Sequence, residues 1–221
     1  LARAVADLAV LHRKLHEAGA AALNGGAEGL SASRSPLEGI RRHNRELKKV
    51  RTFIRKRVAK NEFEFLFLNS FEKMYAMAEA VEKQLEESGC MELYRQSVEK
   101  GRLTHGDYNY HNLLILPGGT AVTGFEHMGI NIQVHDLYYF IRKAMEKFHW
   151  KANPGRISLE AYEKERELEN AERKYIGLSL AYPEKFWKTA SSYYHSNKAW
   201  LPEKSVEKLA LAVRQAEEKP Y

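Results

Sequence analysis

Helical periodicity covers almost the entire sequence, and one short interval without it restricts the fold more than any other feature. The eight segments in which apolar residues recur every three or four positions are residues 1–19, 37–58, 63–88, 90–100, 134–150, 158–177, 183–197 and 203–217. Within the interval, the short apolar runs 113–116 and 121–123 flank a Pro-Gly-Gly sequence, which indicates a hairpin. The pattern predicts a mainly α-helical fold with one small embedded β-hairpin.

Composition favours a folded protein made in a reducing compartment. The chain has 221 residues, of which 44% are hydrophobic, enough for one large domain or two small ones. A single cysteine, Cys90, excludes an intramolecular disulfide framework. The sequence shows neither a secretory leader nor an apolar run of the roughly 20 residues that span a bilayer. We therefore expect cytoplasmic synthesis, no membrane association, and a flexible connector in the Gly-, Ala- and Ser-rich residues 20–36.

Positive charge is concentrated in residues 34–60. This segment holds eleven basic and two acidic side chains, a balance of +9, whereas the whole chain carries +6. The segment is either a solvated helix face or an electrostatic docking surface for an acidic protein partner. A nucleic-acid interface is a third interpretation, and we favour it least. The segment offers only Phe53 for stacking on bases and contains no base-reading motif.

The motif with the clearest chemistry is His-Gly-Asp-Tyr-Asn-Tyr-His-Asn at residues 105–112, between a helix end and a short strand. Phosphoryl transfer needs an Asp beside the attacking hydroxyl, an Asn a few residues later that holds a metal, and a second acid on a following strand. Asp107 and Asn112 have the spacing of the first two groups. A lone pair with this spacing arises often by chance, but the flanking hairpin makes the signal more specific.

The run HGDYNYHNLLIL, followed by AVTGFEHMGINIQVHDLYYFIRKAMEKFHW, resembles the C-terminal lobe of the kinase-like phosphotransferase superfamily, which includes aminoglycoside and choline kinases. Two further segments, residues 8–19 and 182–200, resemble its CotS-type family of bacterial spore coat proteins. The resemblance implies that residues 1–221 form a kinase-like C-terminal lobe. It also implies a location in the spore coat, with coat proteins as partners.

Site residues follow from the resemblance position by position. Asp107 matches the catalytic base, and Asn112 matches a position that binds nucleotide and metal. His105 and Asp136 match residues that brace the catalytic loop. An active member would use ATP and Mg²⁺ as cofactors.

Two departures from the family pattern point to a degenerate site. Gly124 stands where family members carry the main metal-binding Asp. Glu126, two residues later, is the candidate that could partly replace this Asp as a metal and nucleotide ligand. It lies on the same side if the strand continues but is displaced by about 6.6 Å. The sequence also shows neither a glycine-rich phosphate loop nor a strand lysine, so we expect the N-terminal nucleotide-clamping lobe to be absent from this chain.

The sequence thus predicts a CotS-type spore coat or coat-associated protein with a degenerate kinase-like site. The alternative is an active ATP- and Mg²⁺-dependent phosphotransferase acting on a small-molecule or protein hydroxyl. If Gly124 alone silences the site, Gly124→Asp in a full-length protein should restore nucleotide binding.

Several other side chains receive structural interpretations. His12 and His16 have a metal-ligand spacing but lack a third ligand, so packing is favoured. His111 is expected to brace the loop, and Cys90 to be a small buried hydrophobe. An aromatic group is assigned to a core or interface; its members are Phe186, Trp187, Tyr193, Tyr194 and Trp200.

Overall fold

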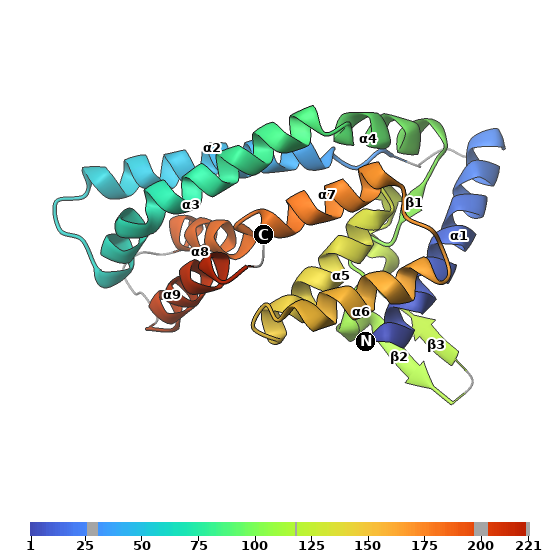
Figure 1. Cartoon of the computed structure of the whole chain (residues 1–221). Coiled ribbons are helices and arrows are strands. Elements are labelled where there is room, and N and C mark those ends of the chain that lie inside the picture. The colour runs from blue at the N-terminus through green and yellow to red at the C-terminus, as the bar shows by residue number, and fades with distance from the viewer. Residues whose placement is uncertain (26–30, 118, 197–202, 220–221) are drawn as a thin grey trace. The chain divides into compact units, whose positions relative to one another are not determined.

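A computed structural model describes residues 1–25, 31–117, 119–196 and 203–219. The chain divides into two compact units, and each unit combines two stretches that are distant in the sequence. The first unit comprises Leu1–Ser35 and Glu87–Gly177, and the second comprises Pro36–Glu86 and Leu178–Tyr221. Figure 1 labels the helices α1 to α9 and the strands β1 to β3.

The first unit combines helices with two small strand pairs. Its helices are α1 (Ala2–Asn24), α4 (Cys90–Glu99), α5 (Val134–Lys147), α6 (Ala152–Glu163) and most of α7 (Asn170–Ala181). Its strands are β1 (Leu103–Thr104), β2 (Leu113–Leu116), β3 (Gly119–Val122) and β4 (Gly129–Ile130), with 3-10 turns η1 (Tyr110–Asn112) and η2 (Phe125–His127). The predicted class, mainly α-helical with a small embedded hairpin, is confirmed.

Two antiparallel strand pairs position the site loop. β2 pairs with β3 from Leu113 opposite Val122 to Leu116 opposite Gly119, as the hairpin signal predicts. β1 pairs with β4 through Leu103 opposite Ile130, a pairing that the sequence analysis did not predict. With two residues in each strand, β1 and β4 are too short to produce a readable alternation of apolar and polar residues. The pairing of β1 with β4 therefore fixes the position at which the following loop begins.

The second unit is a helical bundle. It contains α2 (Pro36–Lys56), α3 (Glu62–Glu87, except its last residue), α8 (Glu184–His195), α9 (Glu203–Glu217) and the end of α7. Its core is rich in aromatic residues, among them Phe63, Phe67, Phe71, Phe186 and Tyr193. The helical spacing of apolar residues in α2 and α3 places these faces against α8 and α9. Of the predicted aromatic group, Phe186 and Tyr193 are core residues, Trp187 and Tyr194 pack against them, and Trp200 lies outside the described residues.

One predicted helix is wrong. The apolar pattern predicts one continuous helix over residues 158–177, but α6 ends at Glu163 and α7 begins at Asn170. Glu172 explains the break, because its carboxylate accepts a hydrogen bond from the backbone N–H of Glu169 at 3.1 Å, as in a capping box. The same carboxylate binds the guanidinium of Arg166 at 2.6 Å. These contacts satisfy polar groups that a continuous helix would satisfy internally.

The expected connector, residues 20–36, contains ordered structure at both ends. α1 continues through Asn24, five residues into that segment. After residues 26–30, which lie outside the description, the backbone N–H of Ser33 donates to the carbonyl of Ile130 at 2.9 Å. The carbonyl of Ser33 also accepts from the hydroxyl of Tyr94 at 2.6 Å. Residues 31–35 thus attach to β4 and α4 of the first unit. Among the described helices, none combines the length and apolar character needed to cross a bilayer.

Candidate functional site

The loop from His105 to Asn112 starts with a close backbone approach. Gly106 has φ +82°, and a Cβ there would lie 2.1 Å from the carbonyl oxygen of His127 in η2. Only glycine fits a left-handed residue this close to another backbone. The tight contact at Gly106 therefore sets the direction in which the loop leaves β1.

Asp136, in the first turn of α5, fixes the start of the loop at His105 and Gly106. It is buried, and its carboxylate accepts from the backbone N–H of His105 at 2.7 Å and of Gly106 at 2.9 Å. The ring of His12 in α1 lies 3.3 Å from the same carboxylate through Nε2, and its Nδ1 lies 2.7 Å from the hydroxyl of Tyr162. Burial raises the pKa of Asp136, but the contacts with His12 and the two backbone donors outweigh it and lower the net pKa. The group therefore stays an anion that fixes the loop.

His105 connects the loop to the end of β3. Its Nε2 lies 2.9 Å from the carbonyl oxygen of Thr123, and its Nδ1 accepts from the backbone N–H of Asp107 at 3.2 Å. This pattern assigns the ring proton to Nε2, because a carbonyl can only accept. The ring of Phe125 packs on His105 at 4.5 Å between centroids. The loop and the turn after β3 are thus one connected structure.

Asp107 and Asn112 face each other across the loop. The amide Nδ2 of Asn112 donates to the Asp107 carboxylate at 3.0 Å and to its backbone carbonyl at 2.9 Å. The second carboxylate oxygen of Asp107 accepts from Nδ2 of Asn109 at 2.9 Å. Each oxygen of this carboxylate therefore has an amide donor from within the loop. The Asn112 amide is turned so that its nitrogen, rather than its oxygen, meets Asp107.

Gly124 lies directly against Asn112. It adopts a left-handed conformation, φ +80° and ψ 50°. A Cβ at this position would lie 2.9 Å from Cγ, Nδ2 and Oδ1 of Asn112, closer than real Cβ contacts allow. The space in which a side chain at position 124 would begin is therefore occupied by the Asn112 amide.

Glu126 does not lie on a continued strand. β3 ends at Val122, the chain turns at Gly124, and Glu126 belongs to the 3-10 turn η2, where it is exposed. The strand does not continue to Glu126, so Glu126 and position 124 do not share a strand face. The left-handed backbone of Gly124 is the physical reason, because it departs from the extended conformation that a strand requires.

The side chains present do not fit a magnesium centre of the kinase type. Mg²⁺ needs near-octahedral oxygen ligands, commonly including one or two carboxylates. Here position 124 has no side chain, and both oxygens of the Asp107 carboxylate accept hydrogen bonds from amides of the loop. Across the described ranges, no three His, Cys, Asp or Glu residues form a group that could hold a metal ion. The loop motif therefore resembles that of a kinase, but the available ligand atoms do not match a magnesium site of the kinase type.

Sequence reasoning missed one residue next to Asp107. Burial, and then the negative charge of Asp107, raise the pKa of Tyr139 in α5. Its position could have been inferred, since Tyr139 follows the loop-bracing Asp136 by three residues and lies on the same helix face.

His12 was interpreted from the sequence as a packing residue. Its two ring nitrogens are occupied by Tyr162 and Asp136, which leaves none for a metal.

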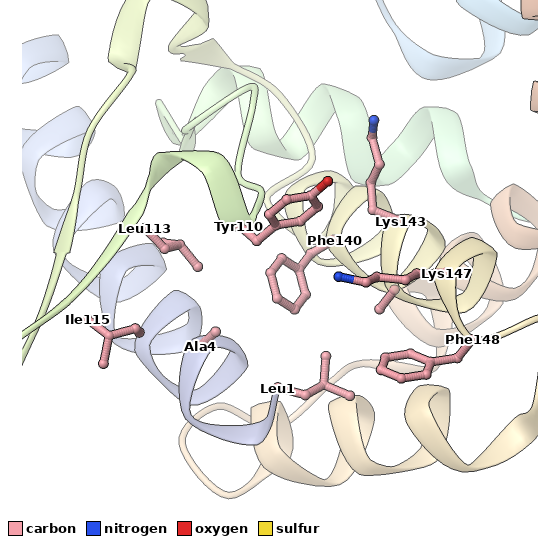
Figure 2. Close-up of a pocket in the computed structure, with 10 residues that line it drawn as sticks. Leu1, Ala4, Tyr110, Leu113, Ile115, Phe140, Lys143, Lys147 and Phe148 are labelled. Carbon is pink, nitrogen blue, oxygen red and sulfur yellow. The ribbon is translucent and has the colours of Figure 1, made fainter.

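A pocket of about 300 Å³ opens beside the loop in the first unit. Figure 2 shows the amine of Lys147 extending over it, with Tyr110 of the loop and Phe140 close by. The Lys147 amine lies 5.4 Å from the centroid of the Tyr110 ring, within cation–π range.

Two other side chains were given structural roles from the sequence. His111, expected to brace the loop, is exposed; its ring lies 4.0 Å from that of Tyr110, and its backbone N–H donates to the side-chain oxygen of Asn109. Cys90 is buried, which raises the pKa of its thiol to about 11.

Comparison with known proteins supports the fold more strongly than any particular activity. No protein-family model and no curated protein matches the sequence. Among solved structures, the crystal structure of an aminoglycoside phosphotransferase from Alicyclobacillus acidocaldarius subsp. acidocaldarius DSM 446 matches with a TM-score of 0.79 and 17% identity. The match covers 98% of this chain and 64% of that chain, so the protein spans less than two thirds of the enzyme's length. The kinase-like phosphotransferase fold predicted from the loop motif is therefore confirmed.

Proposed function

We propose that this chain is a kinase-like lobe of CotS type that works in the spore coat as a binding protein rather than as a phosphotransferase. The observation that carries the proposal is the occupied space at Gly124, where the Asn112 amide lies in place of a side chain. The amide is held there by two hydrogen bonds to Asp107. A side chain at position 124 therefore requires the Asn112 amide to shift from the position in which it binds Asp107.

The coat assignment rests on the sequence segments 8–19 and 182–200, which resemble the CotS-type family. The structural match to an aminoglycoside phosphotransferase is consistent with this assignment, because the CotS-type family and the aminoglycoside kinases are both kinase-like. Coat proteins are the partners that this function requires.

The competing function is ATP- and Mg²⁺-dependent transfer to a small-molecule or protein hydroxyl. The intact brace around the loop favours it, because Asp136 and His105 hold Asp107 in a defined position. In that function Asp107 would orient the acceptor hydroxyl.

Paramagnetic relaxation distinguishes the two functions at the level of the site. Mn²⁺ with ATP is titrated into the isotope-labelled chain, and backbone amide signals are followed at Asn112, Gly124 and Glu126. We expect no selective broadening at millimolar Mn²⁺, with Asp107→Asn as the matched control. Broadening confined to these three amides and lost in the control would establish a metal–nucleotide site and refute the proposal.

A genetic experiment tests the cellular role. The full-length protein, fused to a fluorescent reporter, is expressed in its sporulating host as wild type and as Asp107→Asn. A binding role predicts that both proteins reach the spore surface and support an equally resistant coat. A coat defect in the variant, with normal protein level and placement, would instead indicate that catalysis is required.

A further inference from the structure

Helix α2 of the second unit carries eight basic residues, and seven of them, all except Arg55, fall into two groups that differ in their contacts. One group faces α3, the antiparallel neighbour seen in Figure 1. The ion pairs of this group join Arg41 to Glu82 and Glu86, Lys48 to Glu79, and Arg51 to Glu72. The charge expected to be available over residues 34–60 is therefore partly neutralised within the protein.

A second group lies on another face of α2, roughly a quarter turn around the helix from the first, and we call it the outer basic row. It consists of Arg42, Arg45, Lys49 and Lys56. The positions advance by three, four and seven residues, so they share one helix face. All four side chains are exposed, and none forms an ion pair with an acid in the part of the chain that the structure describes. From Arg42 to Lys56 the row extends over 15 residues, about 21 Å along the axis.

The acids of α2 do not cancel this row. Glu46 is directed toward α8, where its carboxylate accepts from the indole of Trp187 at 2.8 Å and from the hydroxyl of Ser191 at 2.9 Å. Glu38 lies in the first turn of the helix, one turn before Arg42. The central and C-terminal parts of the row therefore present uncompensated positive charge to solvent.

We propose that the outer basic row binds an acidic helix of a partner protein, laid along α2 with carboxylates at positions i, i+3 or i+4, and i+7. The pairing of α2 with α3 is the structural precedent, because the same helix already matches such a series of carboxylates on its other flank. Base stacking lacks a platform here, since Phe53 packs against Tyr194 at 5.6 Å between ring centroids. The inference concerns the second unit and does not depend on the phosphotransferase site.

Binding is tested with a defined probe, a fluorescent alanine-rich helical peptide of about 20 residues carrying Glu at the spacing of the row. A second peptide has the same composition but Glu distributed around the helix. Anisotropy titrations use the wild-type chain and a variant with all four residues of the row changed to Gln. The matched control changes four exposed basic residues elsewhere in the second unit to Gln, namely Lys83, Lys204, Lys208 and Arg214.

We expect the row variant to weaken binding of the patterned peptide at least tenfold, because four exposed ion pairs each contribute up to about fivefold. The control variant should bind as the wild type does, and rising salt should weaken the wild-type complex. Changing the row to Glu should create binding to a matching Lys peptide. Equal binding of both acidic peptides, equal loss in the two Gln variants, or tighter binding of a DNA duplex of equal charge would overturn the proposal.

Discussion

Replacing Gly124 by Asp tests whether the candidate site has lost one carboxylate or has a different construction. From the sequence alone, Gly124→Asp is expected to restore the missing metal ligand. The structure predicts the opposite, because the new Cβ would lie 2.9 Å from three atoms of the Asn112 amide. Asn112 would have to leave the position in which it binds Asp107. The substitution should therefore destabilise the loop without creating a metal site.

The magnitude follows from two contributions. A residue with a side chain loses roughly 1–2 kcal/mol in the left-handed conformation, and Asp lies at the lower end of that range. Moving Asn112 breaks its two hydrogen bonds to Asp107, at about 1 kcal/mol each. Together these contributions predict a loss of about 3 kcal/mol in the free energy of unfolding.

Urea unfolding followed by circular dichroism measures this loss, and calorimetric titration with Mg-ATP measures any gain of binding. Gly124→Ala separates the backbone and Cβ effects from the carboxylate, and it should lose nearly as much stability as Gly124→Asp. Gly119→Ala in the same hairpin is the matched control, because a Cβ at Gly119 meets nothing within 4 Å. Wild-type stability in Gly124→Asp, or Mg-ATP binding that appears only in this variant, would refute the reasoning.

Three further predictions concern buried titratable groups. Because the folded-state pKa of Asp136 lies below its ordinary value, its contribution is complete above about pH 4 and is lost as the pH falls through the folded-state value. Asp136→Asn should remove this acid dependence and lower neutral-pH stability by about 3 kcal/mol, measured by urea unfolding across pH. Burial lowers the pKa of His43 to about 4, so unfolding takes up a proton between pH 6.5 and 4 and stability falls there. His43→Phe, which keeps the stacking on Trp187, should flatten that decline; an unchanged profile would contradict the assignment. Cys90 should react with a thiol reagent only at the rate of unfolding, and rapid labelling of the native chain would show that the thiol is accessible.

The fold was largely readable from the sequence because most of its elements are long and amphipathic. Helices such as α3 repeat their apolar positions over 26 residues, which leaves little ambiguity. The break between α6 and α7 was not readable, since it depends on Glu172 binding both Glu169 and Arg166. β1 and β4 were missed because a two-residue strand is defined by its partner and not by its own pattern.

The candidate site was readable as a list of positions but not as an arrangement. The motif spacing identified Asp107 and Asn112, and the structure places them in contact. What the spacing could not supply is the left-handed backbone at Gly124, or the amide of Asn112 lying across it. Both depend on how the turn after β3 meets the loop. The spacing to Asp136 could place Tyr139 on the loop-facing side of α5, but its proximity to Asp107 depends on the path of the loop.

The division of each unit into two distant stretches affects how the protein is made on the ribosome. Residues 36–86 emerge early, yet the rest of the second unit, residues 178–221, is synthesised after the whole first unit. Until then, Phe63, Phe67 and Phe71 of α3 lack the α8 and α9 residues that bury them. The nascent chain therefore exposes an aromatic surface while about 90 intervening residues are translated. A premature stop after Gly177 would keep the residues of the first unit but remove six of the fourteen buried core residues of the second.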